Sequence, residues 1–308
     1  MERKIRMTFA KYGWSPYEYL FEDFDKFSKA DVRDFVPFYE YISLCSQFND
    51  AQGLAISEDK WASYLFLEKY YGRKAFLLPG KVTEIKGALI DELNNHWPGE
   101  GNEMAKFIIK PLSLDSGIGV QILSVPLPFD QAKVAELVES YPEGSIIEEV
   151  IEQAHFMAQF HPQSVNTVRI STLRMGNDVR VFLPFARIGR SGNIVDNTHN
   201  GGILVPIDIN TGVLQAASTI DYTRYPKHPD TGCQIEGVQI PMWEEAKAMV
   251  EELAMKFDHL QLIGWDLALT DKGWVIVEIN SSPGIPVVKR HFRSEFESLK
   301  RFVAEHQD

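Results

Sequence analysis

The stretch Gly264–Gly284 most constrains what this chain can fold into, because two apolar runs flank the turn-forming residues 271–273. A three-residue loop with glycine at its left-handed position is a common closure of a β-hairpin. Such a loop would place Asp266 directly opposite Glu278. Side chains alternate along a strand, so Asn280 would share the face of Glu278. The pattern therefore predicts that two carboxylates and an amide oxygen converge.

These three side chains suggest a metal site. A hard divalent cation such as Mg²⁺ prefers oxygen ligands, with substrate phosphates and water completing its coordination. The alternative is a hairpin whose polar side chains simply face water. The strand around Glu278 is almost wholly apolar, which is typical of a buried strand, so we favour a cation bound by Asp266, Glu278 and Asn280.

Composition excludes several other classes of protein. A chain of 308 residues can form two or three packed subdomains, and 44% hydrophobic residues is typical of a globular protein. The net charge of −12 argues against an extended nucleic-acid or anionic-membrane surface. Cys45 and Cys233 are too far apart in sequence to suggest a zinc site. No apolar run is long enough to span a membrane, and the residues after Met1 do not resemble a signal peptide, so we expect a cytoplasmic location.

The chain divides into three predicted segments. Residues 1–75 are rich in aromatic and charged residues and predict a mainly helical region. Residues 76–155 alternate strand and helix patterns around a glycine-rich loop at 112–119. Residues 156–308 contain several strands, the hairpin described above and an amphipathic C-terminal helix. The predicted fold class is therefore α+β.

Two features of the middle segment suggest binding of a phosphorylated ligand. Lys110 ends an apolar strand just before the glycine-rich loop, whose amides could approach phosphate oxygens closely. The strand exit 148–151, Glu-Glu-Val-Ile, could pair its backbone with an adenine base. Taken alone, the lysine is more typical of a solvated strand end, and the exit of a core strand with a charged terminus. The loop also lacks the P-loop pattern.

Further along the chain, Arg169 and Arg187 lie in apolar strands, where arginine could bind phosphate or carboxylate oxygens or could simply face outward. His155, His161 and His199 have no spacing that indicates zinc or a catalytic triad. No serine lies in a G-x-S-x-G setting, so no side-chain nucleophile is predicted.

Taken in order, these features resemble the ATP-grasp superfamily of carboxylate–amine ligases over about residues 57–290. The most specific parts are Lys110-Pro111 and the closing Glu278-x-Asn280-x-x-Pro283-Gly284. The resemblance implies two α+β subdomains that clasp ATP, small at 76–155 and large at 156–308. It further implies an ATP-dependent ligase that makes an amide or peptide bond through an acyl phosphate, releasing ADP and phosphate.

The resemblance also implies roles for individual residues. Arg169 and Arg187 would act at the reacting phosphate and acyl group, and Asp266, Glu278 and Asn280 would bind two Mg²⁺ ions. ATP would contact Lys60, Lys110, Ser113, Ser116, Gly117, Gly119, Glu148, Glu149, Val150, Ile151 and Glu152. The substrates would lie near Asn197, His199, Asn200 and Gly201.

Within the superfamily, residues 164–169 and the aromatic N-terminus look like the sugar-transfer-associated group. That group is linked to polysaccharide and cell-surface biosynthesis, so we expect this chain to act in cell-surface polysaccharide or secondary-metabolite biosynthesis. It implies a small-molecule or sugar-linked carboxylic acid and an amine, such as an amino acid, as substrates. Unlike many relatives, the chain shows no small parallel α/β domain at its N-terminus. A small-molecule kinase and a non-catalytic nucleotide-binding protein remain alternatives.

Overall fold

The computed structural model of the protein divides into two compact units. The smaller unit is Ala55–Glu152, and the larger combines Met1–Leu54 with Gln153–Asp308. These boundaries differ from the three segments expected from the sequence, because residues 36–48 pack into the core of the larger unit. The structure describes residues 1–21, 25, 33, 35–113, 118–193, 196, 201–219, 223–284 and 293–307.

The smaller unit is built on an antiparallel sheet with the strand order β1-β4-β2-β3. Phe107 and Ile109 of β2 and Ile147 of β4 form its core with Val134 and Val138 of α8. The elements of this unit are α6 (Lys60–Tyr71), β1 (Ala75–Leu78), the 3₁₀ helix η2 (Val82–Glu84), α7 (Gly87–His96), β2 (Met104–Pro111), β3 (Gln121–Pro126), α8 (Gln131–Glu139) and β4 (Ser145–Glu149).

Helix starts in this unit follow the sequence signals. The Asp59 carboxylate accepts hydrogen bonds from the backbone N–H groups of Trp61 and Ala62, which caps α6. Asp130 caps α8 in the same way through Lys133 N–H. Aspartate is among the residues most favoured at the position before a helix, so both starts agree with the local sequence.

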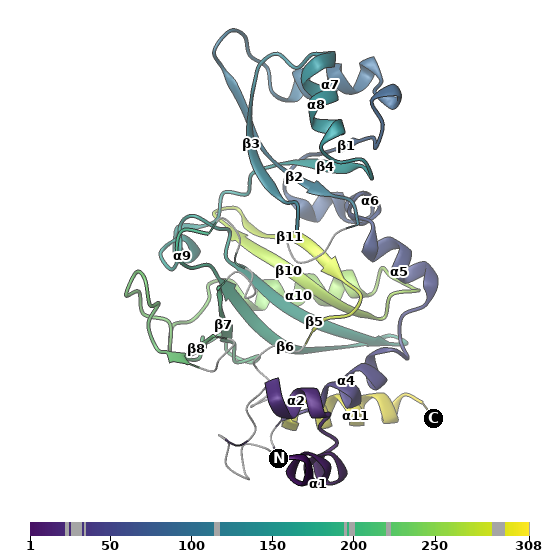
Figure 1. The fold of residues 1–308 in the computed structure, drawn as a ribbon, viewed down its shortest axis with the longest axis vertical. Coiled ribbons are helices and arrows are strands. Elements are labelled where there is room, and N and C mark those ends of the chain that lie inside the picture. The colour runs from purple at the N-terminus through teal and green to yellow at the C-terminus, as the bar shows by residue number, and fades with distance from the viewer. Residues whose placement is uncertain are drawn as a thin grey trace. The chain divides into compact units, whose positions relative to one another are not determined.

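The larger unit contains a sheet with the order β11-β10-β5-β6-β7-β8-β9 (Figure 1). Neighbouring strands are antiparallel throughout. The α+β class predicted from the sequence is confirmed. The strands are β5 (Thr167–Met175), β6 (Asp178–Ile188), β7 (Ile203–Pro206), β8 (Ala217–Ser218), β9 (Arg224–Tyr225), β10 (Leu262–Thr270) and β11 (Gly273–Asn280). The helices are α1 (Glu2–Tyr12), α2 (Pro16–Phe21), α4 (Phe38–Cys45), α5 (Ala51–Glu58), which crosses into the smaller unit, α9 (His155–Ala158), α10 (Trp243–Ala254) and α11 (Arg293–Glu305).

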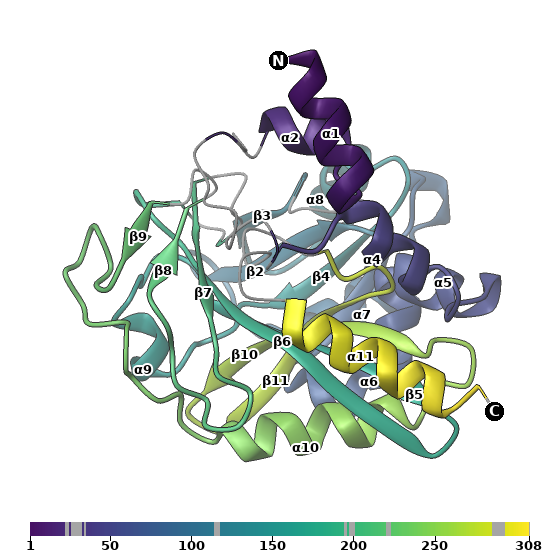
Figure 2. The same cartoon turned by 90° about the horizontal axis from the view of Figure 1, so that it is seen from below.

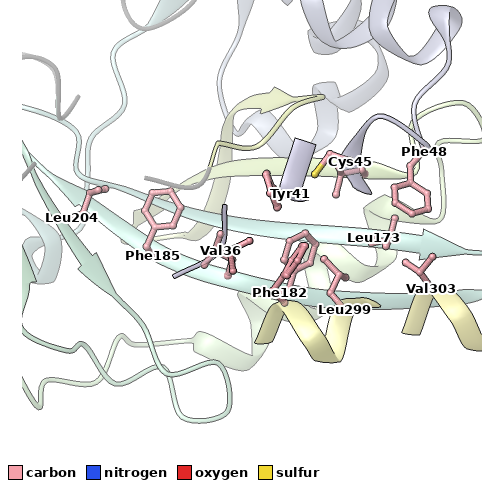
Figure 3. Close-up of a cluster of buried hydrophobic side chains, with 13 residues drawn as sticks. Val36, Tyr41, Cys45, Phe48, Leu173, Phe182, Phe185, Leu204, Leu299 and Val303 are labelled. Carbon is pink, nitrogen blue, oxygen red and sulfur yellow. The ribbon is translucent and has the colours of Figure 1, made fainter. Parts of the chain in front are cut away.

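One face of this sheet is covered by α4 and α11. Tyr41 and Cys45 of α4 pack with Leu299 and Val303 of α11 over strand residues such as Leu173 (Figure 3). Figure 2 shows α11 lying across β6. The cluster also contains Val36, Phe48, Phe182, Leu183, Phe185, Leu204, Leu262 and Phe296.

Helix α10 packs against β5, β6 and β10. Trp265 points away from the face of Asp266, because neighbouring side chains alternate along a strand. Its ring lies 6.1 Å from that of Phe257, just beyond α10. Between these layers, Asp266 of β10 is fully buried and Arg169 of β5 is nearly so. Within the described residues, no helix is long and apolar enough to cross a bilayer.

A glycine in α5 provides a test of the packing in the larger unit. A Cβ atom at Gly53 would lie 2.0 Å from the backbone oxygen of His259, so Gly53→Ala must displace backbone. We expect this variant to lose about 1–3 kcal/mol of unfolding free energy, or more. Gly87→Ala at the start of α7 is the matched control, since a Cβ there meets nothing within 4 Å. Equal unfolding midpoints in a denaturant titration would contradict this packing.

Candidate functional site

The β10–β11 hairpin brings together the residues predicted to bind a metal. Asp266 pairs with Glu278 and Gly264 pairs with Asn280. The predicted pairing of Asp266 with Glu278 is confirmed, but the predicted three-residue turn is wrong. Thr270 pairs with Gly273, so the turn contains two residues, and a bulge next to Asp266 restores the predicted register.

Two arginines on neighbouring strands bind Asp266. Arg169 of β5 pairs with Asp266 across the sheet and donates to both of its carboxylate oxygens, with Nη2 2.6 Å from Oδ2. Arg187 of β6 places its Nη2 2.5 Å from the same Oδ2. Asp266 is fully buried, and Arg169 is 6% exposed. The structure therefore brings together both predicted arginines and the predicted metal ligands on one face.

The protonation of the two acids differs. Burial opposes ionisation of Asp266, but Arg169 and Arg187 outweigh it and hold its pKa well below the usual range. Burial raises the pKa of Glu278, and the Asp266 charge raises it further. Burial also opposes the charge of Arg187, yet Asp266 and Asp196 raise its pKa, so it stays protonated. The pair thus contains one permanent anion and one carboxyl that takes up a proton more readily.

Asp196 is a member of this network that the sequence did not reveal. Its carboxylate accepts hydrogen bonds from Thr167 N–H at 2.8 Å and Thr167 Oγ1 at 2.5 Å, and lies 3.9 Å from Arg187 Nε. Arg187 Nε in turn donates to Thr167 Oγ1 at 3.0 Å. An acidic residue in a loop carries no periodic signal, so Asp196 could not be distinguished from a solvated aspartate.

The smaller unit contains a buried charge triad. Glu148 Oε2 accepts hydrogen bonds from Lys110 Nζ at 2.9 Å, Arg73 Nη2 at 2.6 Å and Arg73 Nε at 2.8 Å. All three residues are less than a tenth exposed. Burial raises the pKa of Glu148, but Arg73 and Lys110 reverse that effect and lower it. Glu148 thus pairs with cations in the structure. Arg73 was missed because its partner lies 75 positions away in sequence.

Several other predicted nucleotide contacts belong to the same unit. Lys60 begins α6, and its backbone N–H donates to Leu112 O at 3.2 Å, which ties that helix to the start of the glycine-rich loop. Glu149 accepts from Lys74 N–H at 2.9 Å. Three further predicted contacts, Val150, Ile151 and Glu152, follow β4 outside any strand.

The glycine-rich loop is described at its two ends. Ser113 is exposed. Gly119 has φ 74°, and a Cβ atom there would lie 2.8 Å from Pro111 Cγ, so this position needs glycine. Tyr141 donates from its hydroxyl to Gly119 O at 2.8 Å. Ser116 and Gly117 lie outside the described residues.

The predicted substrate loop is described at Gly201, which is exposed with φ 88°. Asn197, His199 and Asn200 lie outside the described residues. These three residues and Gly201 stay predictions as substrate contacts.

The larger unit's acids suit a cation that brings further oxygen ligands with it. Within the described ranges, no group of three or more His, Cys, Asp or Glu side chains could hold a metal on its own. The side-chain nitrogen of Asn280 is buried and has no hydrogen-bond partner among the described residues, so this nitrogen does not fix the amide in place. Two carboxylates and this amide fit Mg²⁺, which keeps water or phosphate oxygens in its shell.

The sequence matches the family described as "Sugar-transfer associated ATP-grasp" over residues 42–289. No curated protein matches this sequence.

Three solved structures resemble the chain at low identity. D-alanyl-alanine synthetase A from Vibrio cholerae O1 biovar eltor str. N16961 is 15% identical over 84% of this chain and 67% of its own, with a TM-score of 0.49. D-alanine–D-alanine ligase from Bacillus anthracis is 16% identical over 84% and 69%, with a TM-score of 0.46. N5-carboxyaminoimidazole synthetase from Staphylococcus aureus is 13% identical over 82% and 52%, with a TM-score of 0.42. The chain thus spans between 52% and 69% of these chains.

Neutralising Asp266 and neutralising Glu278 should have different effects on the stability of the protein. Asp266→Asn leaves Arg169 and Arg187 without their shared anion, and breaking a buried pair in this way costs about 3–5 kcal/mol. Glu278→Gln removes a carboxyl that repels Asp266, so its stability at neutral pH should equal or exceed that of the wild type. Chemical unfolding at neutral pH measures both. A stable Asp266→Asn protein would contradict the central place of this carboxylate.

The pH dependence of this difference has a definite sign. The folded pKa of Glu278 lies above its unfolded value of about 4.3, so the folded state binds the proton more tightly. This stabilising contribution is complete below the unfolded pKa and is lost as pH rises through the folded pKa. Wild type should therefore gain stability relative to Glu278→Gln as pH falls from about 7 toward 4. A difference that does not vary with pH would contradict the raised pKa.

Proposed function

Because the chain belongs to the sugar-transfer associated ATP-grasp family, we propose that it is an ATP-dependent ligase that joins a carboxylic acid to an amine. One observation carries the proposal: Arg169, Arg187, Asp266 and Glu278 meet on one face of the larger sheet. This arrangement combines fixed cations with oxygen ligands for a metal, as activation of a carboxylate by a phosphate donor requires. The proposed substrates are a small-molecule or sugar-linked acid and an amine such as an amino acid.

In the first step, a carboxylate oxygen of the acid attacks the γ-phosphorus of ATP, and the bond from phosphorus to ADP breaks. The products are an acyl phosphate and ADP. The amine nitrogen then attacks the acyl carbon, loses a proton, and phosphate leaves with the oxygen that came from the acid. No side-chain nucleophile takes part, so the protein acts by positioning and by electrostatic stabilisation.

Arg169 and Arg187 are suited to stabilise the charge that develops in both steps. Asp266 holds Nε and Nη2 of Arg169 and Nη2 of Arg187, and Thr167 accepts from Arg187 Nε. Among the described residues, the Nη1 atoms of both arginines have no hydrogen-bond acceptor. Donors held in place before reaction stabilise developing charge without reorganising. We assign these nitrogens to the oxygens of the transferred phosphate and of the acyl group.

Two further groups of residues, one in each unit, have proposed roles. Asp266, Glu278 and Asn280 would hold Mg²⁺, which supplies positive charge to the phosphate oxygens. In the smaller unit, Lys110 would bind a phosphate of ATP. Glu148, which is itself held by Arg73, would orient the Lys110 side-chain amine. Lys60, Ser113, Gly119 and Glu149–Glu152 would contact the nucleotide, as would Ser116 and Gly117 from outside the described residues.

The reaction can be tested by screening acids against amines in the presence of Mg·ATP. We expect ADP release only when both substrates are present. With the active acid labelled by ¹⁸O in its carboxylate, one labelled oxygen should appear in the released phosphate. Glu278→Gln should release no ADP while remaining folded. A phosphorylated acceptor formed without an amine would instead indicate a kinase, and ADP release by Glu278→Gln would overturn the metal assignment.

The role of Lys110 can be tested separately by nucleotide binding. Lys110→Met should weaken ATP binding by about tenfold or more, because a hydrogen bond to a charged group contributes about 1.5–3 kcal/mol. Lys106→Met is the matched control, since Lys106 lies exposed on the same strand β2. Calorimetric titration measures both affinities. Equal ATP affinity of the two variants would contradict the proposed phosphate contact.

A further inference from the structure

Asn49, just after α4, connects the two strands of the β10–β11 hairpin at its open end, where β10 begins and β11 ends. Its side-chain oxygen accepts a hydrogen bond from Leu262 N–H at 3.0 Å, and its Nδ2 donates to Leu262 O at 2.8 Å and to Ser281 O at 2.7 Å. Leu262 is the first residue of β10, and Ser281 directly follows Asn280. One amide therefore sets the distance between the start of one strand and the end of the other, next to a proposed metal ligand.

Tyr41 of α4 holds the segment that follows β11, two residues after Ser281. Its hydroxyl donates to Pro283 O at 2.6 Å, and its side chain is fully buried. Burial raises the pKa of Tyr41 well above its ordinary value, so the phenol keeps its proton. It therefore remains a hydrogen-bond donor to this carbonyl.

Residues 281–283, which Asn49 and Tyr41 hold, pack closely on Gly264 and Arg169. A Cβ atom added to Gly264 would lie 2.8 Å from Pro283 Cβ and 3.3 Å from Arg169 Cδ. Glycine at this position thus lets the proline approach the strand beside the arginine side chain. A shift of Pro283 would change the space available to Arg169.

Residues 36–49, here called the supporting segment, are themselves anchored in the larger unit. Val36, Tyr41, Cys45 and Phe48 belong to the core shared with α11 (Figure 3). The segment cannot move without disturbing that core, since packed interiors tolerate little change in volume.

We propose that Tyr41 and Asn49 are positioning residues for the cation and acyl-transfer site, acting through residues 281–283 on Asn280 and Arg169. This role for the helical N-terminal region rests on the proposed function. Neither side chain needs to touch a substrate. Supporting contacts of this kind affect metal affinity because they fix the orientation of the ligands.

The test compares two variants with matched controls on the same segment. Tyr41→Phe removes one hydroxyl and Asn49→Ala removes one amide. Their controls are Tyr39→Phe, an exposed tyrosine of α4, and Gln47→Ala, an exposed amide. Mn²⁺ binding is measured by electron paramagnetic resonance with a non-hydrolysable ATP analogue present, and each variant's thermal unfolding is recorded without ligands.

We expect Tyr41→Phe and Asn49→Ala to bind Mn²⁺ about tenfold more weakly than the wild type, with both controls unchanged. Lower thermal stability with unchanged Mn²⁺ affinity would show a merely structural role and overturn the inference alone. If Asn49→Ala does not fold, Tyr41→Phe decides. A wild type that does not bind Mn²⁺ would overturn the proposed metal site and this inference with it.

Discussion

The binding of Arg169 and Arg187 to Asp266 is the interaction on which the larger unit's site depends. It joins three neighbouring strands, β6, β5 and β10, through the buried Asp266 and Arg169 and the partly buried Arg187. Removing charges from water is unfavourable, and this cost offsets much of the attraction between the partners. A buried pair can therefore add little net stability while it still fixes the positions of its side chains. Here the result is two guanidinium groups with fixed orientation. We infer that this order serves chemistry more than folding.

The smaller unit uses the same solution with different residues. Glu148 faces Lys110 and Arg73 as Asp266 faces Arg169 and Arg187, so in each unit one buried carboxylate holds two cations. The pKa values of Glu278 and Asp196 are raised, which further limits negative charge in the larger unit. Local fields of this kind would allow a chain with a net charge of −12 to bind the ATP proposed as its substrate. The overall charge therefore argues against binding to an extended anionic partner, such as nucleic acid or an anionic membrane, but not against binding of a small anionic ligand.

Local rules predicted much of the fold. The caps at Asp59 and Asp130 follow from short-range chemistry, because aspartate is favoured at the position before a helix. The predicted pairing of Asp266 with Glu278 is confirmed. The pairing was predicted through a wrong turn length, because the compensating bulge has no signature in a run of apolar residues. Arg73 and Asp196 were missed since their partners are set by tertiary structure. For the same reason the hydrogen bonds of residues 36–49 to the hairpin could not be foreseen.

The bulge beside Asp266 divides the hairpin into two parts with different alignments. The inner part carries Gly264, Asp266, Glu278 and Asn280, and its open end is held by Asn49. The outer part runs to the two-residue turn, and its strand pairing is shifted by one residue relative to the inner part. A residue gained or lost at the turn shifts the outer alignment only, because the bulge can take up the difference. Evolution can therefore vary the tip of this hairpin in length while the inner residues keep their partners.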